Sequence, residues 1–345
     1  PANKRNYRKQ EAHLYLASPV SRMHLSDGVA IKKAAQEHKN VTIVGFGYIG
    51  IEILEAFIHN GLHVNIINPH KYLMGAFDDD MAQTIQDYIL TRDGANISVY
   101  NEDYAVRFVG ENGLATKVVT KNGHEFETDF IVVSAGVVPN SEIAVAAGLK
   151  TGVNGSIWVN SHLKTSYPRI YAAGDCCEKH HMVTNHPCWL PLGSTANKEG
   201  RCAAINIANK NCDFEGVLGA AVSRYFDFTV AMTGITEREA KRQGYEVVTA
   251  TVTSEDRAGY MPQAATITLK LIVDANSREI LGVQGIGRGD AEKRVATASI
   301  AIQEAVKVDE FLGLDLPYAP PFSTAIDPFL NALQIVNDKL NRLKN

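Results

Sequence analysis

Three closely spaced glycines form the first stretch whose residue types could do chemistry, in the run Gly45-Phe46-Gly47-Tyr48-Ile49-Gly50. Glycines at this GxGxxG spacing let a turn close tightly, let a pyrophosphate approach the backbone, and let the following helix pack against a strand. The N-terminus of that helix offers unbonded N–H groups and a positive dipole end to the phosphates. The residues expected to bind a nucleotide here are Gly45, Gly47, Tyr48, Ile49 and Gly50.

The elements around this motif must place it at the end of a strand. Residues 41–44 make a short apolar run that is typical of a buried parallel strand, and apolar residues at helical spacing follow from Ile51. Gly61 ends this helix, and residues 64–67 predict a second strand. A GxGxxG motif inside such a strand–helix–strand unit indicates a dinucleotide site rather than a turn that is merely rich in glycine.

The residue after the second strand usually selects the cofactor. A carboxylate there binds the ribose 2′-hydroxyl of NAD, whereas a nearby cation favours NADP. Here Asn68 takes that place, followed by His70 and Lys71. The Asn68 amide can hydrogen-bond the hydroxyl without repelling a 2′-phosphate, and Lys71 could pair with that phosphate. NADH is favoured, because a loop lysine is more often a solvated charge, and NADPH stays open.

Composition limits the class of protein. A chain of 345 residues, 45% hydrophobic and 21% charged, can bury cores for two or three domains. The net charge of −4 and the scattered Lys and Arg residues argue against a nucleic-acid surface. No apolar run reaches the length of a membrane span and no signal peptide is visible, so we expect a cytoplasmic protein. The five cysteines include no CxxC pair and predict no disulfide framework.

Further patterns predict how the N-terminal half is built. Residues 1–26 read as a connector with a short strand at 14–16, and Asn122-Gly123 between strand-like residues is a hairpin signal. The acidic run Asp78-Asp79-Asp80 fits a helix start better than a metal site. We expect helices at 27–38 and 79–92 and strands at 97–100, 104–109, 115–120, 125–127 and 130–133.

A second constellation ends at Gly174-Asp175. The segment 165–175 predicts a turn at Pro168 and then a strand of small and apolar residues, with the aspartate at its carboxyl end. Open α/β sheets bind ligands at that end of their strands. Asp175 could accept a hydrogen bond from a ribityl or ribose hydroxyl, and Gly174 lets the ligand come close. An ordinary aspartate in a strand-end turn remains the alternative.

The last part of the chain carries no nucleotide signal. His180, His181, His186 and Cys188 match no common zinc spacing, so we expect a loop with surface histidines and no metal site. From residue 214 the pattern predicts an α+β module whose apolar content suits a homodimer interface. Its expected elements are a helix capped by Thr236 with Glu239, strands at 247–253, 265–273 and 280–286, and a helix at 288–306.

Five segments, in this order, resemble the flavoprotein pyridine nucleotide-disulfide oxidoreductases: VTIVGFGYIGIE, IVVSAGVVPN, IYAAGDC, LPLGSTANKEGR and LDLPYAPPF. Within that family they are most similar to the branch of NADH peroxidases, NADH oxidases and coenzyme A-disulfide reductases. The resemblance implies an α/β fold with Rossmann-like nucleotide-binding domains, followed by an α+β dimerisation domain. The implied boundaries are a connector or remnant of the FAD domain at 1–26, the NAD(P)H-binding domain at 27–135, the C-terminal part of the FAD-binding domain at 136–213, and the dimerisation domain at 214–345.

The resemblance also implies roles for single residues. Tyr48 would be an aromatic lid over the isoalloxazine, and Glu52 would lie close to the nicotinamide. Tyr260 and Tyr318 would reach the partner subunit's active site, where a phenolic O–H can donate to a thiolate or an oxyanion. Two interface-packing tyrosines are the alternative. The implied cofactor-binding residues beyond the glycine motif are Gly136, Gly174 and Asp175, the last holding the FAD ribityl chain.

One departure from the family pattern bears on activity. The family begins with a further GxGxxG unit for FAD, followed by a redox cysteine, and neither occurs before Gly45. We therefore expect a fragment or an incomplete flavoprotein, consistent with a first residue, Pro1, that is not methionine. Cys176 and Cys177 follow the FAD aspartate and are expected to be packed thiols rather than nucleophiles.

The implied activity is hydride transfer from NAD(P)H to FAD, and from there to a disulfide or persulfide, as in coenzyme A-disulfide reductases. An NADH oxidase or NADH peroxidase, with oxygen or peroxide as acceptor, is the alternative within the family. A non-catalytic nucleotide-binding and dimerisation module is the alternative of another class. We expect a homodimer and a small-molecule substrate, with neither a nucleic acid nor a membrane as partner.

Overall fold

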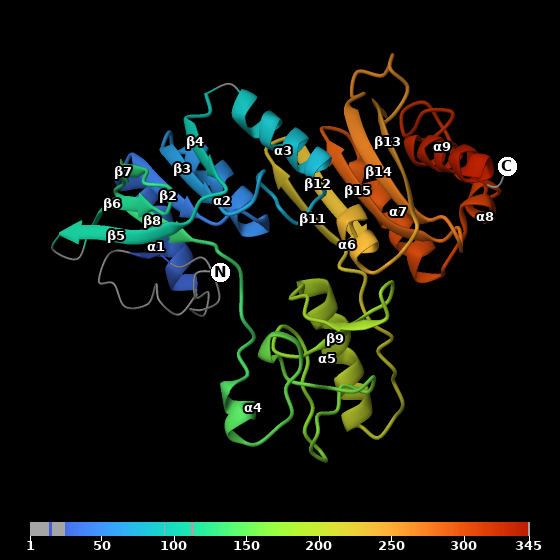
Figure 1. Ribbon diagram of the computed structural model, residues 1–345, viewed down its shortest axis with the longest axis horizontal. Helices are drawn as coiled ribbons and strands as arrows, with labels where there is room; N and C mark the ends of the chain where they lie inside the picture. Colours follow the sequence, from blue (N-terminus) through green and yellow to red (C-terminus); the bar gives the residue numbers. More distant parts are fainter. Residues whose placement is uncertain (1–13, 16–24, 93, 112–113, 344–345) are drawn as a thin grey trace. The chain divides into compact units, whose positions relative to one another are not determined.

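The computed structural model describes residues 14–15, 25–92, 94–111 and 114–343 (Figure 1). Most of the N-terminal connector therefore lies outside the described residues, as do residues 112–113 between the strands predicted at 104–109 and 115–120. The chain divides into two compact units. Unit 1 comprises Pro1–Val137 with Ser223–Asp227, and unit 2 comprises Val138–Val222 with Phe228–Asn345.

Unit 1 is built on a five-stranded parallel sheet with the strand order β1-β8-β2-β3-β4. Its central strand, β2, leads directly into the glycine motif, as the sequence predicts. The strands of this sheet are β1 (Leu14–Tyr15), β2 (Asn40–Val44), β3 (His63–Asn68), β4 (Ile97–Asn101) and β8 (Phe130–Val133). The helices are α1 (Leu25–Glu37), α2 (Tyr48–His59) and α3 (Asp79–Thr91).

The two faces of this sheet are covered by different elements. On one face, Val44 and Ile131 pack against Phe108 and Val118 of the antiparallel strands β5 (Ala105–Glu111) and β6 (Leu114–Thr120). On the other, Phe57 of α2 meets Phe130 edge to face. Each fully buried side chain of this size contributes about 1.5–3 kcal/mol. The hairpin from β6 to β7 (Glu125–Glu127) confirms the prediction at Asn122-Gly123.

The first part of unit 2 has little regular sheet. It contains α4 (Glu142–Ala146), the short helix η2 (Val153–Gly155), the hairpin β9 (Lys179–His181) and β10 (His186–Cys188), and α5 (Gly193–Ile207). The strand predicted before Gly174 is wrong, because Tyr171 makes only an isolated bridge to Lys164. A strand requires a ladder with a neighbour, and no described strand pairs with this segment.

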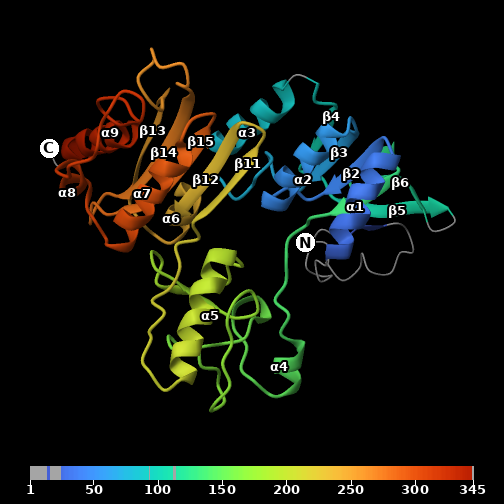
Figure 2. The same cartoon turned by 180° about the vertical axis from the view of Figure 1, so that it is seen from behind.

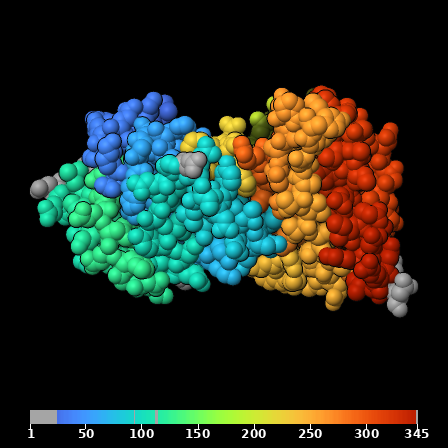
Figure 3. Space-filling model, turned by 90° about the horizontal axis from the view of Figure 1, so that it is seen from above, coloured from blue at the N-terminus to red at the C-terminus, as the bar shows by residue number. Residues whose placement is uncertain are grey.

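The second part of unit 2 is an α+β module. Its strands β12, β15, β14 and β13 pair antiparallel in that order. Helices α7 and α9 both pack into the same core with this sheet (Figures 1 and 2), and the red residues of α9 lie directly against the orange residues of the strands in Figure 3. Its elements are β12 (Phe228–Gly234), α6 (Glu237–Arg242), β13 (Val247–Glu255), β14 (Thr266–Asp274), β15 (Ile280–Gly287), α7 (Ala291–Gln303), α8 (Val308–Leu312) and α9 (Pro328–Leu343). The strand β11 (Ala221–Tyr225) precedes them, and its residues from Ser223 on belong to unit 1.

Two helices of this module were not predicted from the sequence, α8 and α9. The signal for α9 was present, since its buried residues Phe329, Leu333, Val336 and Leu340 follow helical spacing. The predicted cap of α6 is confirmed, because the Thr236 hydroxyl accepts a hydrogen bond from the Glu239 N–H at 3.1 Å. None of the helices in the described part of the chain is long and apolar enough to cross a membrane.

Candidate nucleotide and flavin sites

Gly45 closes the turn at the end of β2. Its φ of +85° is unfavourable for other residues, and an added Cβ would lie 2.7 Å from the Cα of Ala135. The Gly45 N–H donates to the Ile67 carbonyl at 2.8 Å, and the Ser134 hydroxyl donates to the Gly45 carbonyl. The turn is therefore held between the ends of β3 and β8, where only glycine fits.

The other two glycines serve different purposes. An added Cβ on Gly47 would meet no atom within 4 Å, whereas one on Gly50 would lie 3.0 Å from the Phe46 ring. Gly47 is the N-cap of α2 and has no side-chain capping hydrogen bond. The start of α2 thus combines uncapped N–H groups with open space above the backbone, which is the arrangement that binds a pyrophosphate.

Tyr48 and Ile49 begin α2, and both are half-buried. Burial raises the pKa of Tyr48, whose hydroxyl has no hydrogen-bond partner among the described residues. A buried hydroxyl without a hydrogen-bond partner is energetically costly. Gly136, with a φ of +87°, follows the end of β8 next to Gly45's neighbour Ala135.

Glu52 lies one turn further along α2 and is exposed. Its Oε1 accepts a hydrogen bond from the Ser223 hydroxyl at 3.2 Å, within unit 1. The carboxylate is therefore oriented by a residue that is distant in sequence. Its predicted place close to a nicotinamide stays a prediction.

Asn68 is fully buried at the end of β3. Its amide nitrogen donates to the carbonyls of His70 and Tyr72, both at 2.9 Å, and to Oδ1 of Asn101 at 2.8 Å. The side chain thus holds the loop that follows, while its own Oδ1 has no partner in the described residues. The exposed polar groups beyond this strand are His70 and Lys71.

The Gly174–Asp175 corner in unit 2 is held by a buried ion pair. The Gly174 N–H donates to Glu199 of α5 at 2.7 Å, and the Gly174 carbonyl accepts from the Lys179 ammonium at 2.8 Å. Both charged side chains are 0% exposed and lie 3.4 Å apart. The Trp189 indole donates to the Asp175 carbonyl at 2.8 Å, while Asp175 itself is exposed. These contacts hold the backbone of the corner in place, and the exposed Asp175 carboxylate is accessible to a ligand.

Sequence reasoning missed the pair of Lys179 and Glu199. The available signal was the buried face of α5, on which Glu199 falls at helical spacing with Thr195 and Cys202. Burial raises the pKa of Glu199, although Lys179 and the Gly174 N–H partly offset that effect. Burying two charges carries a large desolvation cost, which is offset only while the two groups keep their hydrogen-bonded geometry. The pair therefore restricts the conformation of the Gly174–Asp175 corner.

The cysteines beside this corner are poor nucleophiles. Burial raises the pKa of Cys177 to about 12 and that of Cys188 to about 11, and it also raises the pKa of Cys176. These thiols therefore stay protonated near neutral pH, whereas nucleophilic attack requires the thiolate.

The histidine-rich segment is a hairpin rather than a loop. His180 and His186 are exposed as expected, but His181 is buried on β9, because strand neighbours point to opposite faces. In the described ranges, no group of three or more His, Cys, Asp or Glu residues could hold a metal ion.

The two candidate tyrosines lie in loops of the α+β module. Tyr260 is 77% exposed and Tyr318 is 53% exposed. The Ala258 N–H donates to the Pro320 carbonyl at 3.2 Å, so the structure joins the loops that carry them. Exposed phenols on joined loops are available to a substrate or to another subunit.

A parallel sheet with a glycine turn directly after its central strand is the arrangement of the dinucleotide-binding class of α/β domains. The family model described as pyridine nucleotide-disulphide oxidoreductase matches residues 19–200, and the dimerisation-domain model of the same family matches residues 220–328. The chain therefore belongs to the pyridine nucleotide-disulphide oxidoreductase family.

Relatives with assigned names support this membership. The NAD(P)H coenzyme A polysulfide/persulfide reductase of Pyrococcus horikoshii is 35% identical over 88% of this chain and 67% of its own length. The coenzyme A disulfide reductase of Staphylococcus aureus (strain Newman) is 31% identical over 84% of this chain and 64% of its own. An NADH oxidase of Methanocaldococcus jannaschii is 32% identical over 93% and 70%.

Solved structures share the fold. A NAD-dependent persulfide reductase from A. fulgidus is 35% identical, with a TM-score of 0.88 over 93% of this chain and 59% of that one. Reduced Bacillus anthracis CoADR-RHD is 32% identical, with a TM-score of 0.89 over 96% and 58%. The chain thus spans about two thirds or less of most of these proteins.

Proposed function

We propose that this chain serves an NAD(P)H- and flavin-dependent reduction of a coenzyme A disulfide or persulfide. The observation that carries the proposal is the turn at the start of α2, which is closed at Gly45, open at Gly47 and left without a capping side chain. Such a turn is suited to one ligand class, a dinucleotide held by its pyrophosphate. Relatives named for coenzyme A persulfide and disulfide reduction supply the acceptor class.

Either nicotinamide nucleotide can be accommodated after β3. No carboxylate stands at the end of this strand, and the Asn68 side chain is turned inward. The Lys71 ammonium lies 5.1 Å from the centre of the Tyr72 ring, where its charge is already stabilised. We therefore favour NADH, and Lys71 is the residue that would admit NADPH.

The Gly174–Asp175 corner fits the ribityl part of a flavin. Gly174 has a φ of +84°, and its backbone is open apart from the Ala196 Cβ at 3.5 Å from an added Cβ. Asp175 can accept a hydrogen bond from a ribityl hydroxyl there, and the buried partners of Gly174 keep it in place. The flavin, when bound, supplies the hydride-accepting chemistry that no side chain of the chain provides.

Tyr260 and Tyr318 are proposed to act on the acceptor. A phenolic O–H can donate to the thiolate that leaves a disulfide or persulfide, which lowers the cost of its departure. The match to the family's dimerisation domain supports a homodimer in which these loops serve the partner's site. The alternative that both tyrosines only pack at an interface predicts no loss of turnover on removing the hydroxyls.

One observation favours a second candidate function. The chain has five cysteines, and burial raises the pKa of Cys176, Cys177 and Cys188. A redox thiolate is therefore not evident among these three, which favours a nucleotide-binding and dimerisation module without catalysis of its own. An oxidase or peroxidase activity is a further alternative, supported by the name of the Methanocaldococcus jannaschii relative.

A glycine-to-alanine pair tests the nucleotide site. Gly47→Ala adds a methyl group that meets no protein atom, and Gly28→Ala does the same in α1 of the same unit. If a pyrophosphate lies against Gly47, Gly47→Ala weakens NADH binding in a calorimetric titration by about tenfold or more, as expected for a ligand at backbone contact. Gly28→Ala should bind NADH as the parent chain does. Equal binding by both variants contradicts the site.

The acceptor is tested by turnover. Flavin absorbance of the purified chain shows whether flavin is held, and NADH consumption is then followed with coenzyme A disulfide, coenzyme A persulfide, peroxide and oxygen in parallel. The proposal expects the first two to be the faster acceptors. Faster consumption with oxygen or peroxide selects the alternative, and flavin-free chain that binds NADH without turnover selects the non-catalytic module.

A further inference from the structure

The loop that carries Tyr260 is closed at its base by Asp256. This residue is fully buried, and its N–H donates to the Ala265 carbonyl at 2.9 Å while its carboxylate accepts from the Ala265 N–H at 3.0 Å. The Arg257 guanidinium donates to both carboxylate oxygens of Asp256, at 2.6 Å for the shortest contact. The loop therefore leaves β13 and returns to β14 at one fixed point.

The loop that carries Tyr318 is held through its backbone. The carbonyls of Pro320, Pro321 and Phe322 accept in turn from the Ala258 N–H at 3.2 Å, the Arg257 guanidinium at 3.2 Å and the Lys293 ammonium at 3.1 Å. Prolines have no N–H, so the carbonyls are the polar groups by which this segment can be held. Tyr260 and Tyr318 each lie two residues from the bond that joins Ala258 to Pro320.

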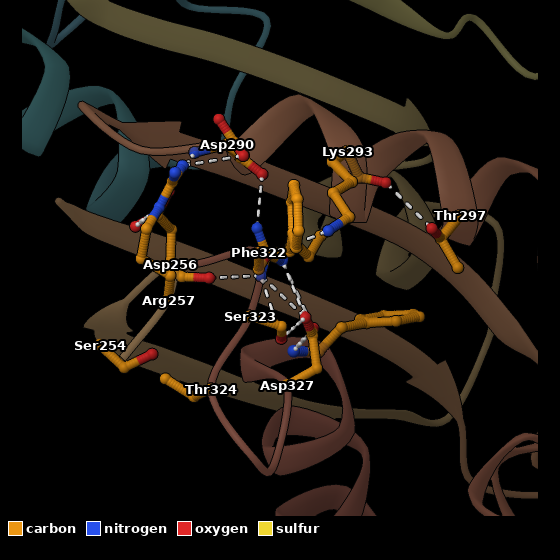
Figure 4. A network of polar contacts seen from close by, with 12 residues as sticks. Ser254, Asp256, Arg257, Asp290, Lys293, Thr297, Phe322, Ser323, Thr324 and Asp327 are labelled. Atoms are coloured by element: carbon orange, nitrogen blue, oxygen red, sulfur yellow. Dashed lines mark hydrogen bonds and ion pairs between the residues drawn. The ribbon is translucent and has the colours of Figure 1, made fainter. Parts of the chain in front are cut away.

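A second arginine fixes this arrangement to the core. Arg294 of α7 is buried and donates to the Asp256 carbonyl at 2.6 Å and to Asp327 at 2.8 Å. The Ser323 hydroxyl donates to the same carboxylate of Asp327 at 2.9 Å. Figure 4 shows these contacts as one connected network between the two loops and α7. Arg294 therefore anchors both loops to helix α7, in addition to the contacts that the loops make with each other.

The charges of this network balance within the protein. The network contains three cationic side chains and three carboxylates: Arg257 pairs with Asp256 and Asp290, Arg294 pairs with Asp327, and Lys293 donates to the Phe322 carbonyl. The Arg257 side chain is 17% exposed and uses its donors on two carboxylates and one carbonyl. A cluster without net charge, in which the arginine donors are already hydrogen-bonded, does not attract an anionic substrate. The network therefore acts through the positions of the two loops.

We propose that Arg257 is a positioning residue that joins the two loops, so that Tyr260 and Tyr318 present their hydroxyls to one substrate as a unit. This inference rests on the proposed function for its consequence in turnover. Arg257 lies in one loop, where it holds Asp256 at the base, and it also donates to the Pro321 carbonyl of the other loop. Arg294 approaches the same two loops from α7, through the Asp256 carbonyl and Asp327. Removing the Arg257 side chain leaves the single Ala258–Pro320 backbone bond as the direct link between the two loops, so that the motion of Tyr318 is coupled less tightly to that of Tyr260.

The experiment follows the two tyrosines directly. The full chain is labelled with fluorotyrosine, and the signals of Tyr260 and Tyr318 are assigned with Tyr260→Phe and Tyr318→Phe. Arg257→Met and Arg257→Lys are compared with Arg278→Met. Arg278 is a matched control, because it is 13% exposed and binds Asp309 and Asn337 near α8 and α9, away from both loops.

The expected result is that Arg257→Met shifts and broadens both tyrosine signals and that Arg278→Met changes neither. Exchange of the Ala258 amide should accelerate about ten- to hundredfold, the ratio expected for losing a hydrogen bond that involves a charged group. Arg257→Lys should keep the Asp256 pair and still release Tyr318, because one ammonium cannot reproduce the guanidinium fork. If Arg257→Met unfolds the chain, the tyrosine signals of Arg257→Lys decide between the two outcomes.

A change confined to Tyr260, with the Tyr318 signal unmoved in both Arg257 variants, overturns the inference. The proposed function is judged separately, by titrating coenzyme A disulfide into the labelled parent chain. If neither tyrosine signal responds, the substrate assignment fails even where the coupling of the loops holds. If both respond in the parent chain, Arg257→Lys should weaken that response while Arg278→Met leaves it unchanged.

Discussion

Replacing Lys179 by methionine tests the buried support of the Gly174–Asp175 corner. The substitution keeps an unbranched side chain of similar length but removes the ammonium that donates to the Gly174 carbonyl at 2.8 Å and to the Cys177 carbonyl at 3.1 Å. It leaves the Glu199 carboxylate, which is 0% exposed, without its counter-charge. Breaking such a pair costs about 3–5 kcal/mol, chiefly because a buried charge is left uncompensated.

The pH dependence of this loss has a defined sign. Burial already raises the pKa of Glu199 above its ordinary value of 4.5, and Lys179 acts in the opposite direction. A carboxyl whose folded-state pKa is raised contributes stability that is present below 4.5 and lost as the pH rises through the folded pKa. Without Lys179 this pKa rises further, so Lys179→Met should be nearly tolerated in acid and most damaging at neutral and higher pH.

The assay is urea unfolding followed by tryptophan fluorescence. Both tryptophans, Trp158 and Trp189, lie in unit 2, and the Trp189 indole is bonded to Asp175. The double variant Lys179→Met with Glu199→Gln should regain about half or more of the lost stability, because the glutamine oxygen still accepts from Gly174 while no charge remains. The control is Lys241→Met, which breaks an exposed pair with Glu237 and should cost less than about 1 kcal/mol.

Two results would refute this reasoning. A loss for Lys179→Met no larger than that for Lys241→Met would show that the buried pair is not maintained in solution. A loss that does not vary with pH would show that Glu199 stays ionised without its partner and that burial does not govern its protonation.

Three more outcomes are expected. Gly45→Ala should destabilise unit 1 by about 2–5 kcal/mol in thermal unfolding, the sum of a strained backbone and an overpacked contact. The added Cβ would lie 2.7 Å from Ala135. A variant as stable as the parent chain contradicts the turn geometry. Burial acts to raise the pKa of Asp256, but Arg257 and two backbone N–H groups lower it overall from 3.8. The parent chain should therefore lose stability as the pH falls below 3.8, and Asp256→Asn should be less stable at neutral pH with a flatter acid limb in pH-dependent unfolding. Thr236→Ala removes the cap of α6 and should cost about 1 kcal/mol in urea unfolding, whereas Thr297→Ala, which removes a bond only to its own helix, should cost less.

Several features were predictable because short-range spacing controls them. The hairpin at Gly123 and the cap at Thr236 each depend on residues that lie within a few positions of one another. The glycine motif at 45–50 is likewise recognised by its local spacing, although the contact that requires glycine at Gly45 comes from the distant Ala135. Backbone freedom, turn type and capping act over that distance, so the residue types alone indicate the local structure.

Other features depended on which segments pair in the folded chain and on which side chains become buried. The segment before Gly174 has the composition of a strand and makes only isolated bridges, because a strand exists only beside a partner. Asn68 occupies the position expected of a ribose ligand, yet Asn101 from the neighbouring strand helps to turn its amide inward. Neither outcome can be read from spacing along one segment.

The sequence by itself determined that this is a dinucleotide-binding α/β chain with an α+β module, since glycine spacing and apolar periodicity are local properties. The tertiary structure decided which charged groups support the candidate sites. Lys179 and Glu199 come from different elements and form an ion pair at Gly174. In the same way, the Arg257 guanidinium of one tyrosine loop donates to the Pro321 carbonyl of the other. A buried charge is tolerated only where folding brings its partner within a few ångströms, and that meeting is a property of the folded chain.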